Sequence, residues 1–248
     1  MGYVIRDEAV YYVSSLTFDM EITAGIHKVE RIRGANVFLV LDSGGSAAVV
    51  DSGMPGNEGR IVEYARSVGV NARMLEYIVL THSDIDHSGS TARLKQITGA
   101  KVAIHQADAP RVAGEKKLKD VKGGMGVLFG IMGKFMRFTP VKPDILLKDS
   151  DKILDMTVIH TPGHTDGSVC LYRENQAMFV GDALRTDSDS SPRLPPGAMT
   201  LNMEQAKESV KKISTYQYSF LFPGHGPPMV RNASQVMKAF VQNGFAVS

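Results

Sequence analysis

Several residue types are scarce in this chain of 248 residues. It has one cysteine, Cys170, so no intrachain disulfide can form, and it has no tryptophan. Cys170 lies in an alternating segment, residues 168–172, which favours a buried structural thiol over a nucleophile. The formal net charge of +2 is far from the strongly basic balance typical of nucleic-acid-binding proteins. We therefore expect no nucleic-acid partner.

Long apolar runs are also missing. No run is long enough to cross a bilayer, so we expect no contact with a membrane. The first eight residues lack the basic stretch and apolar segment of an export signal, and with the single cysteine this predicts a cytoplasmic protein. Hydrophobic residues make up 43% of the chain, which is enough for a sizeable core. We expect a single domain over residues 1–248, and the sequence leaves a homo-oligomer open.

Short apolar segments alternate with helical patterns in both halves of the chain. This alternation predicts an α/β (α+β) fold in which two sheets carry helices on their outer sides. Residues 35–41 and 47–51 flank a glycine-containing turn and predict a hairpin. Asn57 is expected to cap a helix over residues 58–68. Further strands are expected at residues 77–80, 101–105, 157–160, 169–172, 177–180 and 220–222, and further helices at 90–97, 202–213 and 233–242.

Residues 106–140 interrupt this alternation. They contain a lysine-rich piece and then a stretch rich in glycine and methionine, residues 123–138. The segment is either an irregular part of the core or an insertion that covers a site as a lid, since methionine and glycine both allow repacking. A lid of this composition indicates a substrate with an acyl or other hydrophobic portion.

Four segments place metal-binding side chains directly after an apolar run. Imidazole and carboxylate groups together suit zinc, iron or manganese. Ligands at the ends of strands are held rigidly, as a preorganised metal centre requires. The segments are His82-Ser83-Asp84-Ile85-Asp86-His87, Gly163-His164-Thr165, Gly181-Asp182 and Gly224-His225-Gly226.

These segments, in this order and with Asp51 after an earlier strand, resemble the metallo-β-lactamase superfamily. The resemblance extends from about residue 26 to about residue 228. It implies a four-layer αβ/βα sandwich with a two-metal site in the cleft between its sheets. It also implies two divalent ions as cofactors, with zinc expected first and iron or manganese as alternatives.

The resemblance further implies a role for each residue of the motif. A hydroxide shared by the metals would attack the substrate, because two metals acidify water and stabilise the developing oxyanion. Asp86 would also orient that hydroxide or pass a proton to the leaving group. Asp51 would support the site through hydrogen bonds to a ligand. The implied ligands are His82, Asp84 and His164 for one metal, Asp86, His87 and His225 for the other, and Asp182 between them.

Asp84 departs from the commonest pattern of the superfamily, which has histidine at this position. A carboxylate lowers the net charge of a two-metal centre by one, which weakens its Lewis acidity and favours iron or manganese. The flavodiiron branch also has a carboxylate here, a glutamate, but this chain lacks its flavodoxin domain. Asp84 either binds the first metal or leaves that site weak. We favour binding, because an unpaired carboxylate beside bound ions is unfavourable.

The leading functional prediction is a metal-dependent hydrolase that cleaves an ester, thioester, lactone or amide of a small molecule. Asp84 motivates the alternative, an iron-dependent oxygenase or oxygen-reductase-like enzyme on the same fold. A non-catalytic binding domain is disfavoured because the ligand set is nearly intact. The remaining histidines, His27, His105 and His160, lie in or at the ends of strand-like runs and are expected to be structural.

Overall fold

The computed structural model describes residues 3–6, 9–12, 21–71, 74–117 and 138–246. The segment predicted as a lid or irregular core, residues 106–140, therefore falls largely outside the described residues. Its described parts include the short helix α4 (Ala109–Val112) and residues 138–140, which belong to no helix or strand. The lid and the single-domain assignment stay predictions. No helix in the described ranges combines the length and apolar character that crossing a bilayer requires.

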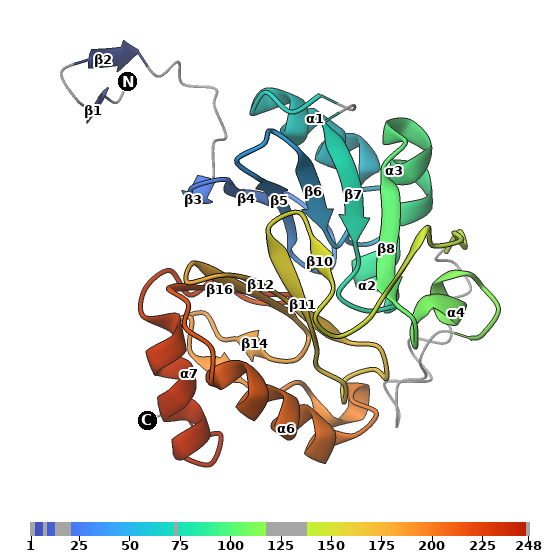
Figure 1. The fold of residues 1–248 in the computed structure, drawn as a ribbon, viewed down its shortest axis with the longest axis vertical. Coiled ribbons are helices and arrows are strands. Elements are labelled where there is room, and N and C mark those ends of the chain that lie inside the picture. Colours follow the sequence, from blue (N-terminus) through green and yellow to red (C-terminus); the bar gives the residue numbers. More distant parts are fainter. Residues whose placement is uncertain (1–2, 7–8, 13–20, 72–73, 118–137, 247–248) are drawn as a thin grey trace.

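A seven-stranded sheet is built from the amino-terminal half of the chain (Figure 1). Its strands β3 to β6 form an antiparallel meander, whereas β6, β7, β8 and β9 run parallel to one another. The predicted hairpin is confirmed as β5 and β6. The strands are β3 (Glu21–Thr23), β4 (Ile26–Val29), β5 (Val37–Leu41), β6 (Ala47–Val50), β7 (Leu75–Val79), β8 (Lys101–His105) and β9 (Ile145–Leu147), and the helices are α1 (Glu58–Ser67), α2 (Ile85–Ser88) and α3 (Thr91–Thr98).

A five-stranded sheet is built from the carboxy-terminal half. Its spatial order is β10-β11-β12-β13-β16, antiparallel except for the parallel pair of β13 and β16. Two further pairs of short strands, β1 with β2 and β14 with β15, form separate two-stranded sheets. The elements are β1 (Tyr3–Arg6), β2 (Ala9–Tyr12), β10 (Lys152–Ile153), β11 (Met156–His160), β12 (Val169–Arg173), β13 (Ala177–Gly181), β14 (Arg185–Thr186), β15 (Pro192–Arg193), η1 (Gly197–Met199), α6 (Met203–Ser214), β16 (Phe220–Pro223) and α7 (Ala233–Gln242).

Three apolar clusters separate four layers of secondary structure. Ile61 of α1 and Leu94 of α3 pack on one face of the first sheet. Phe38 from the first sheet meets Phe179 and Phe222 from the second, with ring centroids 5.5 and 5.0 Å away. A third cluster joins α6 and α7 to the outer face of the second sheet (Figure 1). The predicted four-layer αβ/βα sandwich is confirmed. Each sheet is apolar on both faces, so it packs one face against the other sheet and the opposite face against helices.

Asn57 precedes α1 as predicted, but its side chain does not cap the helix. Its amide oxygen accepts a hydrogen bond from the backbone N–H of Arg33, and its amide nitrogen donates to the carbonyls of Arg33 and Met54. Asn57 is buried, so its amide must find hydrogen-bond partners inside the protein. The backbone groups of Arg33 and Met54 fill that need, and the amide does not bind the N–H groups at the start of the helix. Asn57 thus ties the turn before α1 to the loop between β4 and β5.

Candidate metal centre

Strand direction explains why segments far apart in the sequence meet at one end of the sandwich. In the first sheet β6 and β7 run parallel, so Asp51 and His82, which follow them, leave the same edge. In the second sheet β11, β13 and β16 share one direction, because β11 and β13 both pair antiparallel with β12. The turns after these three strands carry His164, Asp182 and His225.

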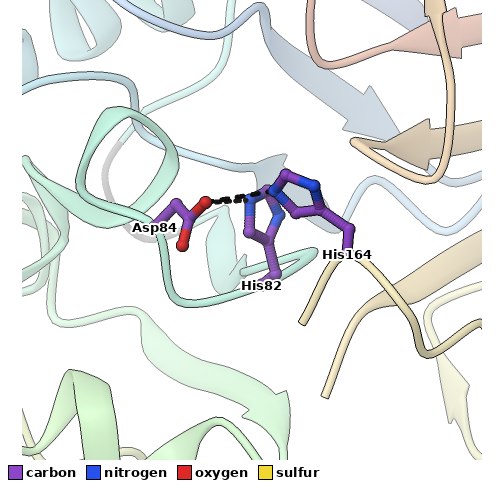
Figure 2. Close-up of side chains that lie close together, drawn as sticks. All are labelled: His82, Asp84 and His164. Atoms are coloured by element: carbon purple, nitrogen blue, oxygen red, sulfur yellow. Dashed lines mark hydrogen bonds and ion pairs between the residues drawn. The ribbon is translucent and has the colours of Figure 1, made fainter. Parts of the chain in front are cut away.

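The first group of side chains that could hold a metal ion is His82, Asp84 and His164 (Figure 2). The Oδ2 atom of Asp84 lies 3.1 Å from Nε2 of His164 and 3.5 Å from Nε2 of His82. Both imidazoles are buried, and the Thr81 hydroxyl lies 3.1 Å from Nδ1 of His82, which fixes the orientation of that ring. The carboxylate at position 84 therefore faces both buried imidazoles.

The second group is Asp86, His87 and His225. Asp86 and His87 lie on α2, a single helical turn. The Oδ2 atom of Asp86 lies 3.1 Å from Nε2 of His225. The side chains of His225 and Asp86 are 39% and 27% exposed, whereas His87 is fully buried. The second group is thus the open side of the centre.

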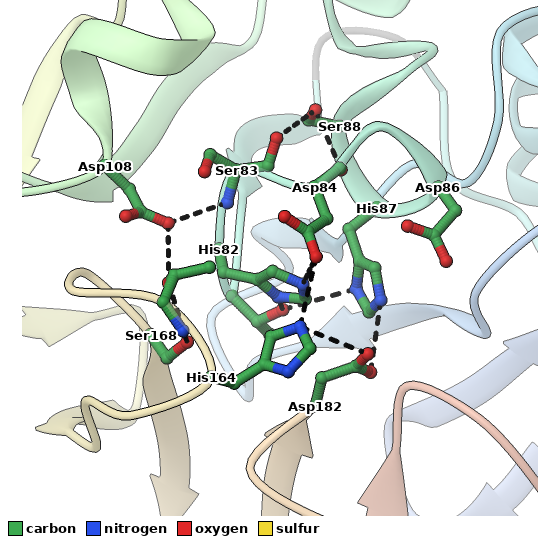
Figure 3. Close-up of polar contacts among 12 residues, drawn as sticks. His82, Ser83, Asp84, Asp86, His87, Ser88, Asp108, His164, Ser168 and Asp182 are labelled. Carbon is green, nitrogen blue, oxygen red and sulfur yellow. Dashed lines mark hydrogen bonds and ion pairs between the residues drawn. The ribbon is translucent and has the colours of Figure 1, made fainter. Parts of the chain in front are cut away.

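Asp182 lies between the two groups (Figure 3). Its Oδ1 is 3.2 Å from Nε2 of His87, and its Oδ2 is 3.6 Å from Nε2 of both His164 and His225. Gly224 allows this placement, because a Cβ atom there would lie 2.4 Å from Oδ1 of Asp182 and 2.6 Å from Cε1 of His87. A glycine is therefore required where the β16 turn passes the carboxylate.

Asp51 is buried and contacts His87 rather than any exposed group. Its carboxylate accepts hydrogen bonds from the backbone N–H and the hydroxyl of Thr81, and its Oδ2 lies 2.8 Å from Nδ1 of His87. A carboxylate on one imidazole nitrogen fixes the tautomer and directs the other nitrogen toward the centre. Asp51 has φ of +60°, a left-handed conformation that turns the chain sharply after β6.

The charges of the cluster hold one another in their ionised forms. Burial alone would raise the pKa of Asp182, but His87, His164 and His225 hold it well below its usual range. Burial alone would lower the pKa of His87, but the carboxylates of Asp182 and Asp51 hold it well above its usual range. The carboxylates therefore require positive charge beside them, which either protons on the imidazoles or divalent cations would supply.

The donor atoms fit a divalent metal. Nε2 of His82, Nε2 of His87 and Oδ1 of Asp182 are buried and make no hydrogen bond in the described part of the chain, although the last two lie 3.2 Å apart as an ion pair. Buried polar atoms in folded proteins almost always have a hydrogen-bond partner, so converging atoms without one need another ligand. Imidazole nitrogen and carboxylate oxygen suit zinc, iron and manganese alike.

The remaining histidines belong to neither group, nor to the third possible metal-binding group, which is formed by His82, His87 and Asp182. The rings of His105 and His160 stack on each other with centroids 4.0 Å apart, and His27 packs edge-on against Tyr64. The sequence analysis does not single out Asp108, a buried carboxylate near the centre that lies in the segment of residues 106–140. Its sequence signal is an aspartate directly before Ala109 and Pro110, a pattern that predicts the start of a helix.

The family model described as the metallo-beta-lactamase superfamily matches residues 31–225. The chain belongs to the metallo-β-lactamase superfamily. It is 28% identical over 229 residues to the probable metallo-hydrolase YflN of Bacillus subtilis, which covers 84% of this chain and 86% of YflN. It is 31% identical over 209 residues to the acyl-coenzyme A thioesterase MBLAC2 of Gallus gallus, which covers 77% of this chain and 72% of MBLAC2.

Solved structures of this superfamily share the fold. One is TTHA1623 in a di-iron-bound form, with a TM-score of 0.59, 22% identity and coverage of 78% of this chain and 88% of that one. At this identity the likeness shows the fold alone. The protein is therefore a member of a metallo-hydrolase superfamily, and its His- and Asp-lined cluster stands where the two sheets meet.

Proposed function

We propose that the protein is a hydrolase that uses two divalent metal ions to cleave an acyl compound, with a thioester as the first choice of substrate. Esters, lactones and amides undergo the same attack at a carbonyl carbon and belong to the same proposal. The observation that carries it is the convergence of three potential ligand groups on buried nitrogen and oxygen atoms that lack hydrogen bonds. The thioester is favoured because MBLAC2, an acyl-coenzyme A thioesterase by name, aligns with most of this chain.

In this proposal each metal takes its ligands from both sheets. His82, Asp84 and His164 would hold the first ion, and a second ion would lie among Asp86, His87 and His225. Support for Asp182 as the shared ligand comes from its two oxygens, which face His87 on one side and His164 and His225 on the other.

Bound divalent ions would supply a hydroxide at neutral pH and polarise the substrate carbonyl. The protein's own contribution is orientation. Asp51 holds the ring of His87, and the Thr81 hydroxyl holds the ring of His82. Asp86 is partly exposed at the open side, where its carboxylate would accept a proton and deliver it to the leaving group.

Zinc is the first choice of metal, and Asp84 is the reason to test iron and manganese beside it. Three carboxylates, from Asp84, Asp86 and Asp182, surround the proposed pair of ions. The more anionic the ligand set, the better it matches harder cations. We further propose a small molecule as the partner, and a cytoplasmic location and a homo-oligomer stay predictions.

Metal analysis and a substrate panel test the proposal together. The purified protein is stripped with a chelator, reloaded with zinc, iron or manganese in turn, and assayed on acyl-coenzyme A thioesters, aryl esters and lactones. Hydrolysis should vanish with the metals and return with one of them. Asp182→Asn should abolish it, whereas the nearby Asp187→Asn, at a carboxylate paired with Arg193, should leave it intact. Iron bound at two equivalents, with oxygen consumed and no substrate hydrolysed, would refute the hydrolase.

A further inference from the structure

Asp108 links two loops that are distant in the sequence. Its Oδ2 accepts a hydrogen bond from the backbone N–H of Ser83 at 2.8 Å and from the hydroxyl of Thr165 at 2.8 Å. Its Oδ1 accepts a hydrogen bond from the backbone N–H of Gly167 at 3.0 Å. Asp108 itself is 0% exposed, so these hydrogen bonds replace water around a buried carboxylate. Figure 3 shows Asp108 beside the ligand cluster, joined to Ser83.

The linked positions are next to the first group of ligands. Ser83 lies between His82 and Asp84 in the chain, and Thr165 directly follows His164. A shift of the Ser83 backbone would therefore move two of the three donor groups, and a shift at Thr165 would move the third. Asp108 accepts hydrogen bonds from both of these loops.

Close packing supports the same connection independently. Gly167 lies so near Asp108 that a Cβ atom there would be 2.7 Å from Cβ, Cγ and N of Asp108. Such distances do not occur between real side chains, so the loop after His164 can approach Asp108 only because residue 167 is glycine.

We propose that Asp108 is a positioning residue that sets the metal affinity of the group His82, Asp84 and His164. The inference rests on the proposed function in taking these three residues as ligands. Asp51 plays the matching part on the other side, since its carboxylate contacts His87 of the second group. Asp51 reaches the first group only through the Thr81 hydroxyl, so removal of Asp108 should affect the first metal and removal of Asp51 mainly the second.

The substitution Asp108→Asn isolates the hydrogen bonds at nearly constant shape. An amide has one acceptor oxygen and one NH₂ donor, so its nitrogen must face the N–H of either Ser83 or Gly167. Two donors then point at each other and one loop must move away. The Thr165 hydroxyl has a second partner 2.8 Å away in Ser168, so its hydrogen bond can be replaced. The hydrogen bond that is lost is therefore one from the backbone N–H of Ser83 or Gly167, in one of the two ligand loops.

The test measures zinc binding to each site in the full chain. Zinc is titrated into stripped protein against a chromophoric chelator, and anomalous diffraction from crystals grown at limiting zinc gives the occupancy of each site. Asp108→Asn should lower the zinc affinity of the His82 group by about 10–100-fold and leave the zinc affinity of the His87 group near its wild-type value. Asp51→Asn should weaken zinc binding mainly at the His87 group. Gly167→Ala, which leaves the carboxylate intact, should resemble Asp108→Asn.

A matched control and the stability of the stripped protein complete the design. Asp144→Asn removes a carboxylate that also accepts a backbone N–H, from Val102, but touches neither ligand loop, and both affinities should be retained. Equal weakening of both sites by Asp108→Asn, in proportion to lost stability of the stripped protein, would show a merely structural role and overturn the proposal. Unchanged zinc affinities would also overturn it. Wild-type protein without zinc, iron or manganese affinity would instead refute the proposed function and, with it, this inference.

Discussion

Replacing Gly224 by alanine adds one methyl group at the most crowded point of the centre. The new Cβ would lie 2.4 Å from Oδ1 of Asp182 and 2.6 Å from Cε1 of His87. To reach even 3.0 Å, the carboxylate or the loop must move by roughly 0.6 Å. The loop itself is held on both sides, because the Gly224 N–H donates to the carbonyl of Gly181 and the Gly224 carbonyl accepts from the N–H of Asn36.

The expected cost of Gly224→Ala has two parts. Overpacking of a well-filled interior costs about 1–3 kcal/mol, which for a chain of this size lowers the melting temperature of the stripped protein by roughly 2–12 °C. Metal–ligand distances tolerate changes of about 0.2 Å, so a shift three times larger should lower metal affinity by at least about tenfold. Elemental analysis after dialysis, chelator competition and thermal unfolding with and without metal measure these effects.

Gly59→Ala is the matched control, because it makes the same chemical change where nothing lies within 4 Å of the new atom. Gly59 is exposed in the first turn of α1, so alanine should stabilise the protein by about 0.5–1 kcal/mol and leave metal affinity unchanged. Wild-type stability and metal content in Gly224→Ala would refute the reasoning, since they would mean that the loop relaxes freely around the methyl group.

Three further predictions concern the thiol, the protons and the metal preference. The thiol of Cys170 is buried and its pKa is raised to about 12, so it should resist alkylation in the folded protein at pH 8 and react at once in denaturant; rapid modification of native protein would contradict its structural role. The raised pKa of His87, held by Asp182 and Asp51 against the effect of burial, keeps its proton at pH 7 in the stripped protein. Zinc must displace that proton, so zinc affinity should rise with pH and level off above the raised pKa, and calorimetry in buffers of different ionisation enthalpy should detect the release; pH-independent affinity would refute this linkage. Asp84→His should shift the metal preference toward zinc over manganese by about tenfold, measured by competition, whereas an unchanged ratio would show that position 84 does not contact the metal.

The ligand-bearing segments were predictable because their signals are local. An apolar run followed by histidine or aspartate beside glycine indicates the end of a strand that carries a potential metal ligand. Strands that run in the same direction then place these ends at one edge of the sheet. The helix α2 was not predictable, since four residues are too few to show a helical period. Asp108 was missed because its hydrogen bonds reach residues 25 and 59 positions away, to backbone N–H groups that carry no sequence signal. The prediction that Asn57 caps α1 was wrong for the same reason, because its amide forms hydrogen bonds with the backbone of Arg33, 24 residues away.

Each group of potential ligands draws on both halves of the chain, and this division shapes the site. His82, Asp84, Asp86 and His87 follow β7 in the first sheet, whereas His164, Asp182 and His225 follow strands of the second. Neither sheet alone therefore brings together a complete group. The buried His82 and His164 lie on the inner side of this junction, and the half-exposed His225 and Asp86 lie on the outer side. In the proposed hydrolase a carbonyl compound would enter from solvent at the more exposed side, while Asp108 joins the two loops that carry the inner group.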